Sequence, residues 1–272
     1  MVWRLLNFQK HNIFENMAID EAIFHETIRN KKAPTIRLYH SQPVAISLGY
    51  FQDARKEVNI EKCNRAGVDI ARRITGGKAV FHFNEITYSV VAGDQEMSFP
   101  PDILGTYKVI SKCLARGLAY LGIKADLVEN GRVLSAKESE AYCFSVPSKN
   151  ELLVEGRKIC GSAQVRRRGG FLQHGSLLLA FDPVKTADLL LPARTPRQVE
   201  KLRETVTSVN DEVASPVDVQ KICSKLKKGF IDELSMDLVE ETLTSAEETL
   251  KSKLIGKYSN NLWNIQGENI LN

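Results

Sequence analysis

Two short segments of this sequence combine glycines with basic side chains, a pattern that can bind an anion or a polarised carbonyl group. The first runs Arg72-Arg73-Ile74-Thr75-Gly76-Gly77-Lys78 and continues to His82. Paired glycines let backbone N–H groups approach a ligand closely, and a guanidinium offers a fork of donors to a phosphate or carboxylate. A solvated Gly-Gly hairpin turn would need the same residues, so this segment alone leaves both interpretations open. It is not a P-loop, because no glycine stands at the required spacing before Gly77-Lys78.

The second segment runs from Glu155 to Gln164, where a Glu-Gly pair predicts a hairpin turn and Lys158 follows inside a strand. Strand alternation predicts that Lys158, Cys160 and Ser162 share one face. A lysine on the inner face of a sheet is costly unless it meets an anion, a thiolate or a substrate carbonyl. On an outward-facing edge it would be solvated, and both placements stay open. The run Gly161-Ser162-Ala163 is small enough to leave room for a ligand or another backbone.

The cysteines are odd in number and widely spread, and no CxxC pair occurs: they are Cys63, Cys113, Cys143, Cys160 and Cys223. This pattern fits neither a disulfide framework nor a zinc site, and we expect no metal. The start lacks the features of a signal peptide, and no apolar run is long enough to span a membrane. We therefore expect a cytoplasmic protein whose thiols stay reduced.

Composition and element pattern together predict a folded α+β protein. Of 272 residues, 43% are hydrophobic and 26% are charged, and the net charge of +4 does not require a nucleic-acid partner. Helices are predicted at 15–29 and 102–121, and strands at 35–39, 44–48, 69–73, 78–81, 86–91 and within 151–179. From about 183 the pattern turns helical, at 184–191, 196–205, 216–234 and 243–256. We expect one domain over 1–272, with a helical C-terminal segment from about 197.

The two segments occur together with other ordered motifs. RRITGGKAVFH is followed by GRKICGSAQ and QHG, and preceded by Asn16-Met17-Ala18, Asp20-Glu21 and SLGYFQ from Ser47. This set resembles the lipoate-protein ligase and octanoyltransferase group of the biotin/lipoate ligase superfamily. The resemblance covers nearly the whole chain and implies a central mixed, largely antiparallel sheet flanked by helices, with a short helical C-terminal extension. One departure is Ser41, where relatives commonly carry tryptophan.

Members of that group divide by mechanism. ATP-dependent ligases activate lipoate as an adenylate, whereas cysteine-dependent octanoyltransferases pass an octanoyl group through a cysteine thioester. The segment Ala141-Tyr142-Cys143-Phe144 resembles the nucleophile segment of the transferases, and Cys143 precedes Lys158 by 15 residues (158 − 143). The resemblance thus implies Cys143 as nucleophile and Lys158 as its activating partner and later proton acceptor. A nearby ammonium raises the thiolate fraction of a cysteine. The other four cysteines are expected to be packing residues.

The same resemblance implies further site residues and partners. The residues expected to shape the acyl and acceptor pocket are Arg73, Gly76, Gly77, His82, Gly161, Ser162, Ala163 and His174. Each histidine could instead be a hydrogen-bonded core residue. The implied donor is octanoyl-acyl carrier protein, and the implied acceptor is a lysine of glycine cleavage H protein or of a lipoyl domain. No cofactor, nucleic acid or membrane is expected, and we expect a monomer. Arg166-Arg167-Arg168 is either a solvated hairpin tip or a docking point for an acidic partner.

Three other functions stay open. An ATP-dependent lipoate-protein ligase would use ATP and Mg²⁺, with Lys158 on the adenylate; the Cys143 segment and the short C-terminal tail count against it. An octanoyl amidotransferase between lipoyl proteins would also use a cysteine. A non-catalytic acyl-binding module would keep the glycines but would have no reason to keep both Cys143 and Lys158.

Overall fold

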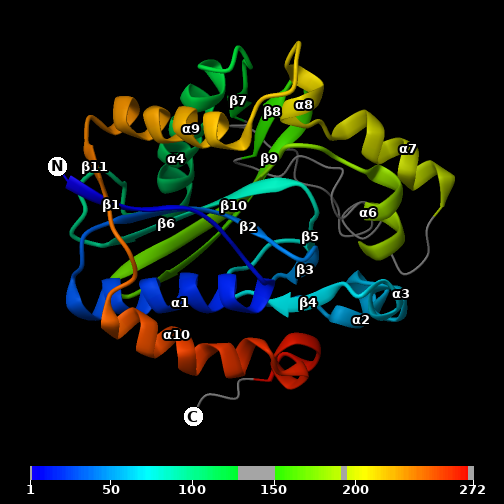
Figure 1. The fold of residues 1–272 in the computed structure, drawn as a ribbon, viewed down its shortest axis with the longest axis horizontal. Coiled ribbons are helices and arrows are strands. Elements are labelled where there is room, and N and C mark those ends of the chain that lie inside the picture. The colour runs from blue at the N-terminus through cyan, green and yellow to red at the C-terminus, as the bar shows by residue number, and fades with distance from the viewer. Residues whose placement is uncertain (1, 128–150, 191–194, 269–272) are drawn as a thin grey trace.

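The computed structural model describes residues 2–127, 151–190 and 195–268. Its centre is an eight-stranded sheet with the strand order β11-β1-β2-β6-β10-β9-β8-β7, accompanied by a three-stranded sheet β4-β3-β5 (Figure 1). The pairs β11–β1 and β1–β2 are parallel, and the remaining pairs of the large sheet are antiparallel. The α+β class and the largely antiparallel mixed sheet are confirmed.

The strands have the following bounds: β1 Val2–His11, β2 Thr35–Ser41, β3 Ala45–Leu48, β4 Asp69–Arg72, β5 Val80–His82, β6 Glu85–Gly93, β7 Asp126–Leu127, β8 Leu152–Val154, β9 Arg157–Arg167, β10 Gly170–Leu178 and β11 Asp237–Glu240. The helices are α1 Ile13–Asn30, α2 Ala54–Glu57, α3 Ile60–Ala66, α4 Ile103–Ala119, α6 Pro183–Leu190, α7 Pro196–Thr205, α8 Val209–Glu212, α9 Val219–Leu234, α10 Ser245–Tyr258 and the π-helical turn η1 Leu262–Gln266.

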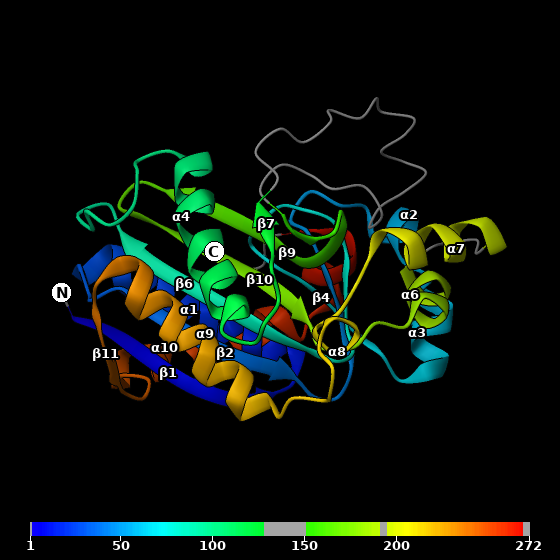
Figure 2. The ribbon, with the colours of Figure 1, turned by 90° about the horizontal axis from the view of Figure 1, so that it is seen from above.

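Different helices cover the two faces of the large sheet. Figures 1 and 2 show α1 and α10 on one face and α4 and α9 on the other. The central strands β6 and β10 are buried along their whole length, because both faces are covered. Helix α4 begins at the cap Asp102, whose side chain accepts from the Gly105 N–H at 2.8 Å, and it buries the predicted stripe that includes Ile110 and Leu118.

The last third of the chain packs against the first third. The predicted helices there are present, but β1 and the edge strand β11 were not predicted. Strand β11 pairs with β1, and α10 packs beside α1 (Figure 1). Beyond α10, Trp263 donates from its indole Nε1 to the Arg72 carbonyl at 2.7 Å, and Asn264 accepts from the Arg72 N–H at 2.9 Å. The C-terminal segment therefore holds the end of β4, next to the Gly-Gly loop.

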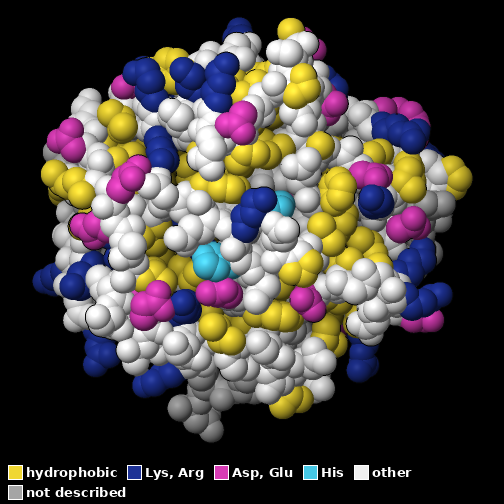
Figure 3. Space-filling model, in the orientation of Figure 1, with side chains coloured by type: hydrophobic (Ala, Val, Ile, Leu, Met, Phe, Trp, Pro, Cys, Tyr) yellow, Lys and Arg dark blue, Asp and Glu magenta, His cyan; other side chains and the backbone are white. Residues whose placement is uncertain are grey.

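The outer surface mixes charges of both signs. On the face shown in Figure 3, basic and acidic side chains are interspersed, with a group of basic side chains along α9. Within α9, Lys228 pairs with Asp232 at 2.8 Å. Across the described ranges, no helix is both long and apolar enough to cross a lipid bilayer.

A buried ion pair joins α1 to α10. The Glu21 carboxylate accepts from Lys257 Nζ at 3.0 and 2.8 Å and from the Tyr258 hydroxyl at 2.5 Å. Burial acts to raise the pKa of Glu21, but His25, Lys257 and Tyr258 outweigh it and lower that pKa to about 2. The ionised carboxylate therefore stabilises the packing of the C-terminal helix.

We predict that Glu21→Gln lowers the free energy of unfolding at pH 7 by about 3 kcal/mol, because it leaves the Lys257 ammonium buried without its counter-charge. The pKa of Glu21 is lower in the folded than in the unfolded chain, so its contribution is complete above about pH 5 and is lost as the pH falls toward 2. Denaturant titrations of both proteins at pH 7 and pH 3 check this. Glu248→Gln, which removes a half-exposed partner of Lys251 on α10, is the control. An undiminished Glu21→Gln effect at pH 3 would contradict the prediction.

Candidate active site

The two predicted motifs meet on the α1 side of the large sheet. The loop Thr75–Lys78 connects β4 to β5 and lies against β9 and β10. A Cβ placed on Gly77 would lie 3.4 Å from the Ala163 Cβ, and the Thr75 hydroxyl lies 2.7 Å from His174 Nε2. The two motifs therefore lie against each other, although almost 100 residues separate Thr75 from His174.

Arg73 is buried beneath this loop, and protein groups accept from all three of its nitrogens. Nε donates to the Thr75 hydroxyl at 3.1 Å, and Nη1 donates to the Ser47 carbonyl and hydroxyl at 3.0 and 3.1 Å. Nη2 donates to the carbonyls of Gly76 and Lys78 at 2.8 and 2.7 Å. Burial lowers the pKa of Arg73 to about 10. The guanidinium fork therefore shapes the loop from inside.

His82 backs one of the two hydroxyl groups that accept from Arg73. Its Nε2 lies 2.9 Å from the Ser47 hydroxyl, and its Nδ1 lies 3.2 Å from the Glu85 carboxylate. Burial acts to raise the pKa of Glu85, but contacts with His40 and His82 outweigh it and lower that pKa to about 2. The result is a buried hydroxyl–imidazole–carboxylate chain that ends on Arg73.

His174 backs the other hydroxyl in the same way. Its Nε2 contacts Thr75, and its Nδ1 lies 3.2 Å from the Asp20 carboxylate. Asp20 also accepts from Arg37 at 2.9 Å and from the Tyr39 hydroxyl at 2.8 Å. Burial lowers the pKa of His174, although Asp20 opposes the effect, so the neutral imidazole is favoured. Both histidines thus fix the hydroxyl groups of Ser47 and Thr75, which accept hydrogen bonds from Arg73.

Gly49 permits a close approach between two loops. A Cβ there would lie 2.0 Å from the Gly77 carbonyl oxygen, and the neighbouring Tyr50 N–H donates to the Thr75 carbonyl at 2.8 Å. Gly77 itself has a φ of 92°, which favours glycine, whereas a Cβ on Gly76 would meet nothing within 4 Å. The segment after β3 therefore packs closely against the Gly-Gly loop.

Strand β9 carries Lys158 on the face of the site, but its neighbours do not alternate as predicted. Leu153 pairs with Lys158 whereas Leu152 pairs with Cys160, so β9 carries one extra residue at Ile159. Ile159 and Cys160 both turn into the core beneath α4 and α9. The prediction that Lys158 shares a face with Cys160 and Ser162 is therefore wrong, because the bulge places Lys158 on the face of Gly161, while Cys160 and Ser162 do share a face.

Ser162 lies on the opposite face, in a separate polar cluster. Its hydroxyl lies 2.6 Å from the Tyr88 hydroxyl, which accepts from Gln173 Nε2 at 3.0 Å. A Cβ on Gly175 would lie 2.6 Å from both the Ser162 hydroxyl oxygen and the Tyr88 ring, so this glycine makes room for their contact. Ser162 thereby fixes β9 to β10 and β6 behind the site.

Four of the five cysteines lie in described residues, and all four are free and buried: Cys63, Cys113, Cys160 and Cys223. Burial raises the pKa of each thiol, to about 11 for Cys63 and Cys223 and to about 12 for Cys160. They are packing residues, as predicted. Cys143 lies outside the described residues, and its role stays a prediction.

The basic turn at 166–168 has mainly internal partners. Arg166 donates to the Thr106 hydroxyl at 2.8 Å and lies over the Phe171 ring, and Arg167 lies 5.9 Å from the Phe24 ring centroid. Arg166 therefore supports the hairpin, whereas Arg167 and Arg168 are exposed. A docking role for this turn stays a prediction.

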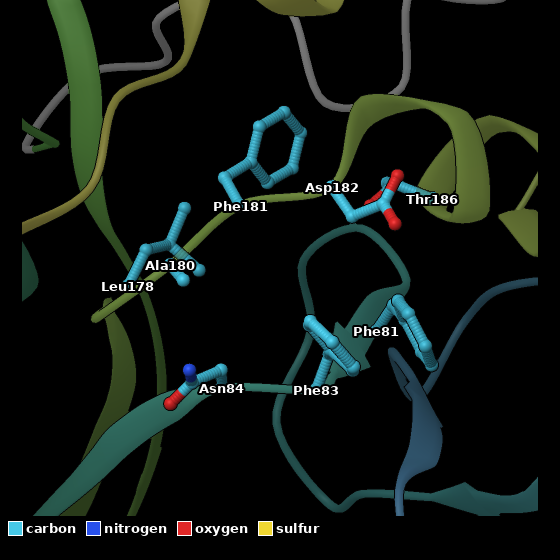
Figure 4. Close-up of a pocket in the computed structure, with 8 residues that line it drawn as sticks. All are labelled: Phe81, Phe83, Asn84, Leu178, Ala180, Phe181, Asp182 and Thr186. Atoms are coloured by element: carbon cyan, nitrogen blue, oxygen red, sulfur yellow. The ribbon is translucent and has the colours of Figure 1, made fainter. Parts of the chain in front are cut away.

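A small hollow lies beyond the Gly-Gly loop, where β5 approaches α6. Figure 4 shows that the rings of Phe81, Phe83 and Phe181 and the side chain of Leu178 surround it. Its volume is about 10 Å³, enough for a single water molecule. It is too small for an eight-carbon chain.

Several residues of the site were not predicted from the sequence. Asp20 and Ser47 lie in motifs that were recognised, but only their buried positions show that they act on His174 and Arg73. Glu85 and Glu151 were missed. The available signal was a carboxylate at the start of an otherwise apolar buried strand, where an ionised group needs a partner.

We predict that Gly49→Ala lowers the free energy of unfolding by about 2 kcal/mol or more, because the new methyl group would overlap the Gly77 carbonyl. Gly76→Ala is the matched control and should change stability by less than about 1 kcal/mol, since its Cβ meets open space. Urea denaturation of the two variants checks the difference. Equal stabilities would show that the two loops are not tightly packed.

Comparison with known proteins agrees with this geometry. The family model described as the lipoyl protein ligase A/B catalytic domain matches residues 12–231. The octanoyltransferase LipM of Kyrpidia tusciae is 40% identical over 269 residues, covering 96% of this chain and 98% of the relative. The octanoyltransferase LipM of Brevibacillus brevis is 36% identical over 275 residues, covering 97% and 99%.

Solved structures show the same fold. A putative lipoate protein ligase from T. acidophilum with bound lipoic acid aligns with a TM-score of 0.79 at 29% identity, covering 98% of this chain and 100% of that chain. A lipoate-protein ligase A bound with ATP aligns with a TM-score of 0.80 at 29% identity and the same coverage. The resemblance inferred from the motifs is thus confirmed, and the chain belongs to the lipoyl protein ligase A/B catalytic domain family.

Proposed function

We propose that this chain is an octanoyltransferase of lipoate biosynthesis, which moves an octanoyl group from a carrier-protein thioester to a lysine of a lipoyl-accepting protein. The relatives that match it over nearly their whole length are octanoyltransferases. The observation that carries the proposal is the position of Lys158: a buried ammonium on the face that also carries Ala163 and the Gly-Gly loop. A lysine side chain there suits the activation of a thiol and the transfer of protons at an acyl carbonyl.

In the first step, the Cys143 thiolate attacks the carbonyl carbon of the donor thioester. A new carbon–sulfur bond forms, the bond to the carrier thiol breaks, and that thiolate leaves and takes a proton from the Lys158 ammonium, which becomes a neutral amine. One thioester replaces another, so the step is close to thermoneutral and needs no ATP. Lys158 favours the thiolate form of Cys143 by its charge, whereas burial raises the pKa of each of the four described thiols.

In the second step, the amine of the acceptor lysine attacks the Cys143 thioester. A carbon–nitrogen bond forms, the Cys143 sulfur leaves as a thiolate, and the proton lost by the amine passes to the neutral Lys158 amine, which becomes an ammonium again. Because an amide is more stable than a thioester, this step drives the transfer. The loop held by Arg73 forms one wall of the site, facing Ala163.

The proposed donor is octanoyl-acyl carrier protein, and the proposed acceptor is glycine cleavage H protein or a lipoyl domain. The relatives named as octanoyltransferases and the ligase fold support a lipoyl-accepting partner in general terms. We place the reaction in the cytoplasm, where the free thiols of the described residues would stay reduced.

The proposed octanoyl thioester on Cys143 can be detected directly. Incubation with octanoyl-acyl carrier protein in the absence of ATP should add one octanoyl group to the protein, detected by intact mass. Hydroxylamine should remove the group, because a thioester is cleaved by this nucleophile and an amide is not. Cys143→Ser should carry no hydroxylamine-sensitive adduct, while Cys160→Ser, at a buried packing thiol, should still form it.

The opposite result would favour a ligase, which the fold also accommodates, since an ATP-bound lipoate-protein ligase aligns over 98% of the chain. No adduct, together with ATP-dependent lipoylation that survives Cys143→Ser, would overturn the transferase proposal.

The second prediction concerns the acceptor. Octanoyl-enzyme that has been freed of donor should pass its acyl group to H protein or to a lipoyl domain, and the acceptor should gain a hydroxylamine-resistant octanoyl group. Substitution of the acceptor lysine by arginine should abolish the transfer, because the guanidinium is a poor nucleophile. Single-turnover mass spectrometry with a panel of acceptors measures this and ranks them.

A further inference from the structure

The side chain of Lys158 occupies the space above Gly161. A Cβ placed on Gly161 would lie 2.7 Å from Lys158 Cε and 2.8 Å from Lys158 Nζ, much closer than side-chain contacts allow. The lysine therefore folds along β9 rather than away from it. The sequence suggested that Gly161 leaves room for a ligand, but in the structure that room belongs to Lys158.

Glu151 fixes the other end of the lysine. Its carboxylate Oε1 accepts from Lys158 Nζ at 2.5 Å, and both side chains are about nine-tenths buried. Glu151 directly precedes β8, and the β8–β9 hairpin brings it back toward β9. Both groups are shielded from water. Separating them would leave each charge buried without its partner, which costs free energy, so the ammonium and the carboxylate hold each other strongly.

The backbone of Lys158 is fixed as well. Its carbonyl accepts from the Thr207 N–H at 2.9 Å, and it pairs with Val206 in an isolated bridge. The bulge at Ile159 turns the lysine to the face of Gly161. Thr207 fixes the backbone of Lys158, and Glu151 fixes its ammonium group. Only a glycine therefore fits beneath the aliphatic part of the Lys158 side chain.

We infer that Glu151 and Gly161 are positioning residues for Lys158, the first by counter-charge and the second by its missing side chain. This inference rests on the proposed role of Lys158 in acyl transfer. In the second step the Glu151 carboxylate favours the ammonium form of Lys158, and so it helps Lys158 Nζ to take the proton of the acceptor amine.

Gly161→Ala is the main test, because it displaces only the flexible end of a side chain. We expect the variant to stay folded at the assay temperature while the rate of octanoyl-adduct formation falls about 10- to 100-fold, the loss that a misplaced catalytic group produces. Gly256→Ala, on α10 with open space around its Cβ, is the matched control for a glycine-to-alanine change and should keep the wild-type rate.

Glu151→Gln tests the counter-charge with nearly the same shape. We expect kcat of the complete transfer to fall about 10-fold or more with KM for the carrier protein little changed, because the donor-binding surface is intact. The pH at which adduct formation reaches half of its maximum should rise in Gly161→Ala, since the ammonium no longer lies where it favours a thiolate. A merely structural role would lower the rate equally at every pH.

The outcomes separate the two proposals. If wild type forms no octanoyl adduct, the proposed function fails, whatever the variants do. If wild type forms the adduct and Gly161→Ala forms it at the same rate and with the same pH profile, the positioning role is overturned while the function stands. Wild-type kcat in Glu151→Gln would remove Glu151 from the mechanism in the same way.

Discussion

The site depends on one constraint: a guanidinium buried from water must satisfy its donors with protein groups. Arg73 meets this by drawing five acceptor contacts from Ser47, Thr75, Gly76 and Lys78. Three of the four residues lie in the loop that follows Arg73. The loop is therefore shaped by the need to surround a cation. An arginine that looks from its sequence like a ligand-binding residue is instead the residue around which the binding loop is built.

The charge of Arg73 is balanced at a distance. Two further ionised groups, Asp20 and Glu85, reach it through His174 and His82, and a second buried cation, Arg37, lies against Asp20. Both carboxylates have pKa values below their ordinary range despite burial. Two cations thus face two carboxylates in a region without bulk water, and each imidazole links a carboxylate to a hydroxyl. This arrangement joins α1, both sheets and the loop into one polar unit.

Much of the fold and of the candidate site could be predicted from the sequence, and the parts that could not have physical explanations. The periodicity at 15–29 and 102–121 predicted α1 and α4, and the motifs placed Gly77 and Ala163 in one site. Alternation failed at Lys158 because a bulge adds a residue that only strand pairing reveals. Glu151 was missed because nothing local shows that the hairpin brings it to Lys158. Strand β11 was missed because it is short, mostly exposed and paired to the far end of the chain. The assignment of Cys143 stays a prediction.

The contact between Arg72 and the C-terminal segment has a consequence for synthesis. Arg72 donates to the Gly49, Tyr50 and Gln52 carbonyls and so braces the segment beside the Gly-Gly loop, but its own N–H is held by Asn264, 192 residues later. At a translation speed of about 5–20 residues per second, that partner is made about 10–40 s after Arg72. During this interval the nascent chain lacks the hydrogen bond from Arg72 N–H to Asn264, which holds the end of β4 next to the Gly-Gly loop. The brace at Arg72 is therefore complete only after Asn264 has been made and has folded back onto β4.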